Sequence, residues 1–127
     1  MSSIKTILII FTCSGIGGAA RWGMQKWMSS LFPSSFPAGT FAVNIAGCFL
    51  IGVFYALSET KNVFTPEWRL ALTAGFCGGF TTFSAFGYEN MNLLRTGDYF
   101  NFGIYTSLSV ALGIAAVFAG SVVIKGL

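Results

Sequence analysis

Residues 75–84 of the chain read GFCGGFTTFS and lie in the middle of an uncharged run, residues 70–88. At about 1.5 Å of rise per residue, a helix of that length crosses the hydrocarbon core of a bilayer. Glycine weakens a helix interior by about 1 kcal/mol relative to alanine, so Gly75, Gly78 and Gly79 predict a helix break at membrane depth. Irregular backbone persists there only where protein or a polar cavity satisfies its N–H and C=O groups. The sequence therefore predicts a binding site at this break.

The whole chain has the composition of an integral membrane protein. Of its 127 residues, 54% are hydrophobic and only 9% are charged, whereas an ordinary soluble domain carries about 25% charged residues. We predict an all-α fold, with one transmembrane domain over residues 1–127. Its four helices should span about residues 4–22, 39–58, 69–90 and 99–124, with the third helix broken at its glycine-rich stretch.

The few charged residues divide almost evenly between the two sides of the membrane. With four spans, one side holds Lys5, Lys61, Arg69 and Lys125, and the other holds Arg21, Lys26 and Arg95. A protein with a single orientation should show a clear excess of cations on its cytoplasmic side. The near balance favours insertion in both directions and an antiparallel homodimer. A monomer or a parallel dimer with a weak bias is the alternative. The cations are too scattered to form a nucleic-acid surface.

Aromatic and polar side chains around the predicted break are suited to lining a passage. Phe80 and Phe83 are three residues apart, as are Thr81 and Ser84, so in a continuous helix each pair would share a face. Asn44 is the amide side chain deep in the second span. It either contacts a ligand or joins two helices through a hydrogen bond.

The fourth span adds Tyr105 and Ser109, one helical turn apart. Such hydroxyls either line the passage or bond to carbonyls of their own helix. Phenyl edges are electropositive, and hydroxyl and amide groups donate hydrogen bonds, so the lining favours a small anion. Glu89 should lie near the mouth of the passage, and we do not assign it as a proton carrier. Carbonyls freed at the break attract a hard cation, which two breaks meeting on a dimer axis would hold.

Other readings of the sequence are weaker. The chain has no histidine, no nucleophile–base pair and no cofactor motif in its required context, so we predict that it is not an enzyme. Cys13, Cys48 and Cys77 lie inside predicted spans and are interpreted as packing residues rather than disulfide or zinc ligands. Close packing of membrane helices through small residues is also the expected role of further glycines: the glycines of residues 15–18, Gly47, Gly52, Gly113 and Gly120.

Taken together, these residues resemble the Fluc (CrcB-type) fluoride channels of bacteria. The resemblance rests on GGAARW at residues 17–22, GTFAVNIAG at residues 39–47 and CGGFTTFS at residues 77–84, with Phe86 and Glu89. It covers essentially the whole chain, and although each motif alone would be weak, the set is highly specific.

The resemblance implies a multi-pass protein of the bacterial inner membrane that exports fluoride passively. It also implies an antiparallel, dual-topology homodimer in lipid, with two parallel fluoride pores and a structural sodium ion at the interface. By position it implies fluoride contacts from Asn44, Phe80 and Phe83, a polar track of Thr81, Thr82, Ser84, Tyr105 and Ser109, sodium-binding carbonyls at Gly75 and Gly78, and a vestibule cation at Arg21.

Two rival functions remain at the level of sequence. A small multidrug-type, proton-coupled cation exporter is equally short and four-spanning, but it needs a carboxylate in its first helix, and residues 6–20 contain none. A scaffold subunit whose glycines and hydroxyls only pack helices would pass no ion at all.

Overall fold

The computed structural model describes residues 2–126, and within them every regular element is a helix. The elements are α1 (Ser3–Leu31), α2 (Ala38–Ala56), η1 (Leu57–Lys61), α3 (Pro66–Leu70), η2 (Ala71–Cys77), α4 (Gly78–Phe80), α5 (Phe83–Arg95) and α6 (Tyr99–Lys125), where η marks a π-helical stretch. They form 4 helical segments long and apolar enough to cross a membrane. The predicted all-α, four-helix fold is therefore confirmed.

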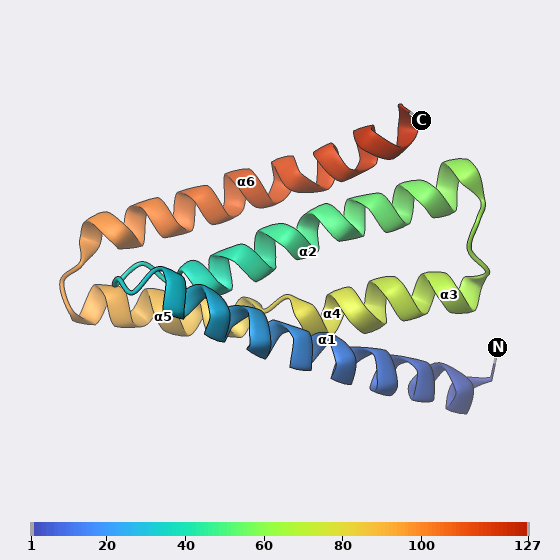
Figure 1. Cartoon of the computed structure of the whole chain (residues 1–127), viewed down its shortest axis with the longest axis horizontal. Coiled ribbons are helices and arrows are strands. Elements are labelled where there is room, and N and C mark those ends of the chain that lie inside the picture. The colour runs from blue at the N-terminus through green and yellow to red at the C-terminus, as the bar shows by residue number, and fades with distance from the viewer. Residues whose placement is uncertain (1, 127) are drawn as a thin grey trace.

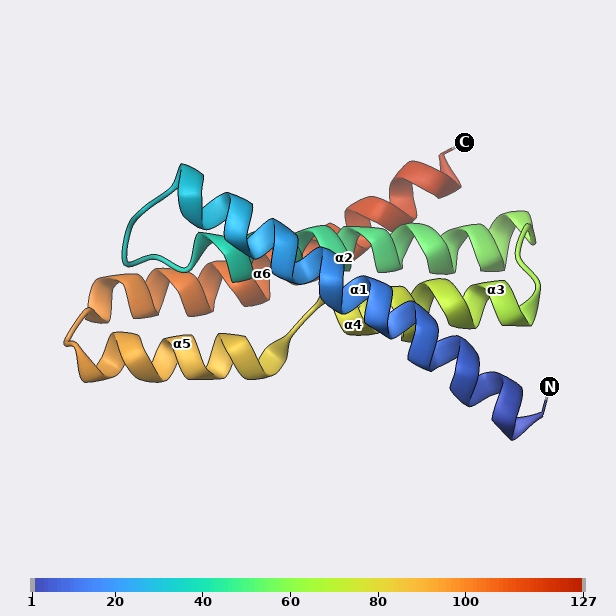
Figure 2. The same ribbon diagram turned by 60° about the horizontal axis from the view of Figure 1, so that its bottom comes forward.

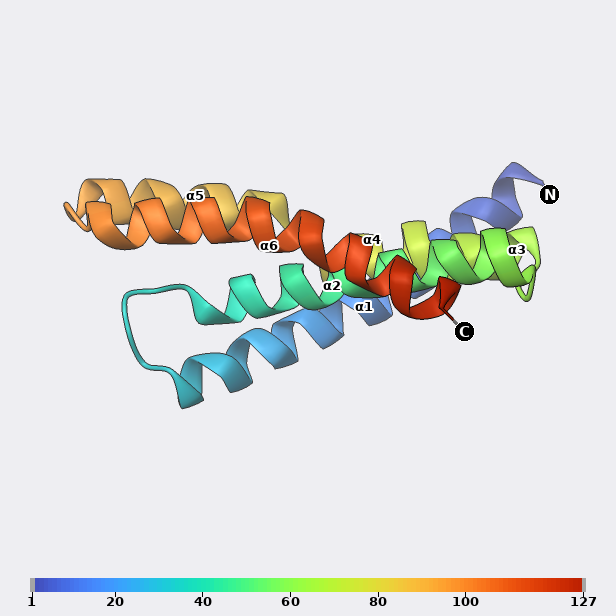
Figure 3. The same cartoon turned by 90° about the horizontal axis from the view of Figure 1, so that it is seen from above.

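The segments run alternately up and down, so both ends of the described chain lie at the same end of the bundle (Figure 1). The η1–α3 connection is also at that end, whereas the α1–α2 loop and the α5–α6 turn are at the other. Helix α6 packs along α2, and α1 crosses over η2 and α4 (Figure 2). Seen from above, the α5–α6 hairpin and the α1–α2 hairpin diverge (Figure 3).

Glycines set the closest helix contacts, as predicted for several of them. A Cβ added at Gly52 would collide with the carbonyl oxygen of Val117, and one at Gly120 would collide with that of Phe49. These two contacts bring α2 and α6 together backbone to backbone, which is how membrane helices associate without a hydrophobic driving force. In contrast, a Cβ at Gly15 would meet nothing within 4 Å.

The first helix is longer than the predicted span, because α1 continues to Leu31. Residues 23–31 read GMQKWMSSL and include several good helix formers. The helix ends before Pro33, since proline disfavours helical backbone in the residue preceding it. The extension carries Gln25, whose backbone meets Gly39 at the start of α2.

The third segment is interrupted, but not at its glycines. Gly78 and Gly79 are helical, and the extended residues are Thr81 (φ −89°, ψ 159°) and Thr82 (φ −151°, ψ 117°). The prediction that the glycine-rich stretch itself breaks the helix is wrong by a few residues. Thr82 caps the next helix, because its Oγ1 accepts the Ala85 N–H at 3.2 Å.

The glycines beside the interruption instead let α1 approach. A Cβ at Gly79 would collide with the Ser14 carbonyl oxygen, and one at Gly17 would collide with the Phe76 carbonyl oxygen. The reciprocal arrangement places a glycine of each segment against the backbone of the other. The position of α4 at the break is therefore set by α1.

A polar cluster ties the two connections at the far end of the bundle. Asp98 caps α6 by accepting the Asn101 N–H at 3.3 Å, and its Oδ2 accepts the Ser35 hydroxyl at 2.8 Å. The Asn101 side chain also donates to it at 2.8 Å. Hydrogen bonds from Asn101, and then from Ser35, lower the pKa of the Asp98 carboxyl. The cluster joins the α1–α2 loop to the start of α6.

Candidate functional site

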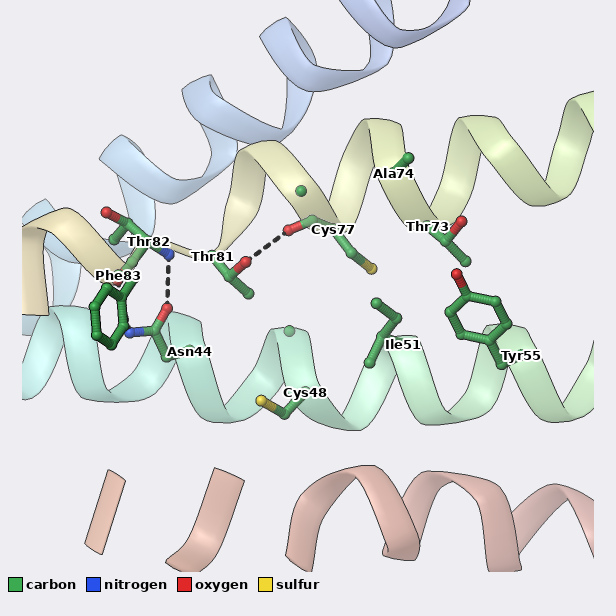
Figure 4. A pocket seen from close by; sticks show the side chains of 12 residues that line it. Asn44, Cys48, Ile51, Tyr55, Thr73, Ala74, Cys77, Thr81, Thr82 and Phe83 are labelled. Atoms are coloured by element: carbon green, nitrogen blue, oxygen red, sulfur yellow. Dashed lines mark hydrogen bonds between the residues drawn. The ribbon is translucent and has the colours of Figure 1, made fainter. Parts of the chain in front are cut away.

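The side chain of Asn44 on α2 hydrogen-bonds both backbone groups of Thr82, the N–H and the C=O, at the interruption. Its Oδ1 accepts the Thr82 N–H at 2.8 Å (Figure 4). Its Nδ2 donates to the Thr82 carbonyl at 3.1 Å. The side chain thus replaces the helical partners that the break removes. An amide carries two N–H groups, so one donor of Asn44 is left over. Asn44 thus joins two segments and keeps one N–H that these two bonds do not use.

An open groove of about 410 Å³ runs beside Asn44 between α2 and the η2–α4 segment (Figure 4). We call it the α2–η2 groove. Its lining residues are Asn44, Gly47, Cys48, Ile51, Tyr55, Thr73, Ala74, Cys77, Gly78, Thr81, Thr82 and Phe83. The structure thus gathers five of the predicted site residues, Asn44, Gly78, Thr81, Thr82 and Phe83, around one depression.

The two phenylalanines do not share a helix face, and that prediction is wrong. Phe80 ends α4, is only 6% exposed and stacks on Phe76 with ring centroids 5.5 Å apart. Phe83 begins α5, is 82% exposed and lies 5.7 Å from the ring of Phe86. The extended threonines between them turn the two rings into different surroundings.

The hydroxyls at the break have different partners. Thr81 Oγ1 donates to the Cys77 carbonyl at 3.0 Å, so it bonds back to its own helix. The methyl group of Thr81 lies over Gly47, where a Cβ would collide with it. Thr82 Oγ1 lies 3.3 Å from Ser84 Oγ. The side chain of Thr81 therefore packs, while those of Thr82 and Ser84 form a hydroxyl pair.

A second polar cluster lies one turn before Asn44 on α2. Tyr105 is fully buried (0% exposed), and its hydroxyl donates to Glu89 Oε1 at 2.8 Å. The Thr40 hydroxyl donates to Glu89 Oε2 at 2.7 Å. Gln25 Nε2 donates to Thr40 Oγ1 at 3.0 Å. Sequence reasoning missed Gln25 and Thr40 as parts of the site, although the GT pair at residues 39–40 belongs to one of the motifs that carry the resemblance.

Glu89 connects this cluster to the end of the bundle. It lines a pocket of about 260 Å³ whose other lining residues are Ser35, Pro37, Asn92, Leu93 and Thr96. The pocket lies where the α1–α2 loop meets α5.

Ser109 lies one turn beyond Tyr105 on α6 and has a hydroxyl with no partner. Among the buried side-chain nitrogen and oxygen atoms of residues 2–126, its Oγ is the one that makes no hydrogen bond. A buried polar group normally finds a partner, because leaving it unpaired costs about 1–3 kcal/mol. The Ser109 hydroxyl is therefore not committed to another side chain or to the backbone.

The carbonyls of the glycine stretch differ in their availability. Gly79 O accepts the Arg21 Nε–H at 3.1 Å, and Gly75 O accepts the Gly78 N–H. In a continuous helix the carbonyl of Gly78 would accept the N–H of Thr82, but that N–H goes to the Asn44 side chain. Arg21 thus binds the end of the broken helix, and the Gly78 carbonyl has lost its helical donor.

A family model described as "CrcB-like protein, Camphor Resistance (CrcB)" matches residues 8–121 of the chain. The chain belongs to the CrcB-like family. It is 44% identical over 125 residues to a Leptospira interrogans protein named "Fluoride-specific ion channel FluC", covering 98% of each chain. A protein of the same name from Gloeothece citriformis is 46% identical over 120 residues, which cover 94% of this chain and 96% of the relative. One from Bacteroides fragilis is 47% identical over 122 residues, which cover 92% of this chain and 94% of the relative.

The CrcB-like assignment confirms the resemblance found in the sequence. Together with the 4 apolar helices, it makes the chain a multi-pass membrane protein. It also confirms the prediction that the chain is not an enzyme, because the family is one of channels.

Proposed function

We propose that this CrcB-like chain is a fluoride-selective channel that lowers cytoplasmic fluoride by passive export across the bacterial inner membrane. The observation that carries the proposal is its 44–47% identity, over nearly the full length, to relatives that are each named fluoride-specific channels. The geometry adds neutral donors: the spare N–H of Asn44 and the unpaired hydroxyl of Ser109.

Neutral donors suit conduction better than fixed cations do. Fluoride is small and strongly hydrated, so a pathway must replace its water without holding it. Amide and hydroxyl hydrogens and the electropositive edges of phenyl rings supply that replacement. The proposed fluoride contacts are Asn44, Phe80 and Phe83, and the proposed polar track consists of Thr82, Ser84, Tyr105 and Ser109, with Thr81 packed beside it. Arg21 is proposed to serve the vestibule.

The working unit in this proposal is an antiparallel homodimer with two parallel pores. Phe83 is 82% exposed beside the α2–η2 groove, and a Cβ at Gly23, Gly87 or Gly103 would meet nothing within 4 Å. A second copy would cover these surfaces and bring its own Phe83 ring toward the α2–η2 groove of the first copy. Reporter fusions at the C-terminus should give signals from both sides of the membrane; a signal from one side alone would eliminate the antiparallel arrangement.

A sodium ion at the dimer interface fits the donor set in part. Gly78 is exposed, and its carbonyl has lost its helical donor, which suits a hard cation. The Gly75 carbonyl already accepts the Gly78 N–H, although a carbonyl oxygen has a second lone pair. When bound, the ion would supply a fixed positive charge. Dialysis into sodium-free buffer should reduce fluoride flux unless another cation replaces it, and full flux in metal-free protein would remove the site.

The two rival functions predict different fluxes. A proton-coupled exporter needs an acidic residue in its first helix, and α1 (Ser3–Leu31) contains none. A scaffold subunit would leave vesicles impermeable. Parallel measurements of fluoride, chloride and proton flux from proteoliposomes therefore separate all three functions.

We expect reconstituted protein to release fluoride much faster than chloride, and Phe83→Ile to slow fluoride release roughly fivefold. The variant removes one phenyl edge, and an aromatic contact of this kind is worth about 1 kcal/mol. Efflux is followed with a fluoride electrode. Phe118→Ile is the matched control, because Phe118 is 67% exposed on α6 and lies outside the proposed pathway. Vesicles that retain fluoride, or lose chloride equally fast, would contradict the proposed function.

A further inference from the structure

Gln25 contacts the start of α2 in the part of α1 that extends beyond the predicted span. A Cβ at Gly39 would come within 2.9 Å of the Gln25 Cα and carbonyl oxygen, so the two backbones meet at this glycine. The amide of Gln25 reaches across and donates to Thr40, whose side chain is almost fully buried. This hydrogen bond is the first link of the chain that ends at Tyr105.

The direction of these hydrogen bonds follows from counting protons. A threonine hydroxyl has one proton, and that of Thr40 goes to Glu89 Oε2 at 2.7 Å. Its oxygen can therefore only accept from Gln25, which must present its NH₂ group across the 3.0 Å contact. Gln25 thus donates to Thr40, and Thr40 and Tyr105 both donate to Glu89.

Tyr105 also has a single hydroxyl proton, and in this structure it goes to Glu89. For the Tyr105 hydroxyl to donate a hydrogen bond to an anion, it must first give up its hydrogen bond to the Glu89 carboxylate. Glu89 then depends on Thr40 alone. A hydroxyl that accepts one hydrogen bond becomes a better donor in the next, because chains of hydrogen bonds polarise one another. The strength of the Thr40 bond to Glu89 therefore depends on Gln25.

We propose that Gln25 is a positioning residue for anion conduction. Acting through Thr40, its amide holds the Glu89 carboxylate in place while the Tyr105 hydroxyl turns toward the permeating anion. Without the amide, the Thr40 hydroxyl is free to rotate, and the Tyr105 hydroxyl stays hydrogen-bonded to Glu89 instead of turning toward the anion. The proposal rests on the function proposed above and adds a residue of α1 that has no contact with the anion.

The first variant is Gln25→Met, which keeps the length of the side chain and removes its donors. We expect fluoride efflux from proteoliposomes to fall about three- to tenfold, the effect of one net hydrogen bond. Gln25→Glu has the same shape, but its carboxylate competes with Glu89 for the Thr40 proton. We expect an equal or larger fall, and this variant replaces Gln25→Met if the latter does not give monodisperse protein.

The decisive comparison places the Gln25 change in two Thr40 backgrounds. Thr40→Ser keeps the hydroxyl, so the fall caused by Gln25→Met should persist. Thr40→Val removes it, so the same change should cause no further loss. A merely structural effect of Gln25 on helix packing would reduce flux by the same factor in both backgrounds. Thermal unfolding of each variant shows whether packing has changed.

The outcomes separate the two proposals. If wild-type vesicles retain fluoride, the proposed function fails and the role of Gln25 fails with it. If the wild type conducts but the Gln25 variants equal it, or lose the same factor in the valine background, only the positioning role is overturned.

Discussion

Asn44→Asp should reduce fluoride flux by roughly a thousandfold. The carboxylate keeps an acceptor for the Thr82 N–H, but it loses the donor to the Thr82 carbonyl and the spare N–H. It also places a negative charge beside the anion. Two like charges about 4 Å apart repel by about 4 kcal/mol at an effective dielectric constant of about 20, and each 1.4 kcal/mol is about a factor of ten in rate. Fluoride efflux from proteoliposomes measures the effect.

Asn62→Asp is the matched control, because it makes the same change of charge in the η1–α3 connection. Asn62 has a positive φ of 52°, a conformation that aspartate also tolerates. We expect its flux to equal that of the wild type. A near-normal flux in Asn44→Asp would show that fluoride does not pass beside this amide. If flux falls only in proportion to a loss of thermal stability, Asn44 serves to hold the Thr82 backbone and does not contact fluoride.

Gly79→Ala should destabilise the folded protein by about 3 kcal/mol or more, because overpacking typically costs about 1–3 kcal/mol. The added methyl group would collide with the Ser14 carbonyl oxygen, with Ser14 Cα only 2.9 Å away. Backbone atoms of a neighbouring helix cannot turn aside as a flexible side chain can. Helix α1 would have to move away from α4, and Arg21 would lose its bond to the Gly79 carbonyl. Thermal unfolding in detergent, with gel filtration, measures the loss.

The neighbouring residue provides the control. A Cβ at Gly78 would meet only the Thr73 carbonyl oxygen, at 3.9 Å. Gly78→Ala should therefore be tolerated, and it gains up to about 1 kcal/mol of helix propensity. If Gly79→Ala were tolerated as well as Gly78→Ala, the glycine at residue 79 would not be needed to admit α1.

The interruption of the third segment shows how far local sequence reasoning reaches. The glycines and the absence of charge predicted a helix break within residues 75–84, and the structure has one there, but at Thr81 and Thr82. The sequence did not show that the helix yields at Thr81 and Thr82, because the competing partner for the Thr82 N–H is Asn44, 38 residues away. The same long-range contact separates Phe80 from Phe83, which a continuous helix would have placed on one face.

The hydroxyls of the predicted polar track make the same point. By sequence, Thr81 and Ser109 were both predicted to line the pathway, with back-bonding to its own helix as the alternative for Ser109. The structure distinguishes them, because Thr81 donates to Cys77 four residues earlier, whereas the Ser109 hydroxyl is buried without a partner. No local pattern separates these cases, since both residues have a carbonyl one turn before them.

Composition and short motifs by themselves determined that the chain enters a membrane, crosses it four times, interrupts its third segment and resembles a fluoride channel family. Those properties depend on hydrophobic length and on local residue types, which are written along the chain. The tertiary structure alone decided where the helix yields and which donors stay free. It also places four side chains in one chain of hydrogen bonds: Gln25, Thr40, Glu89 and Tyr105. Those partners are separated by 15, 49 and 16 residues, and only the packing of α1, α2, α5 and α6 brings them within hydrogen-bonding distance.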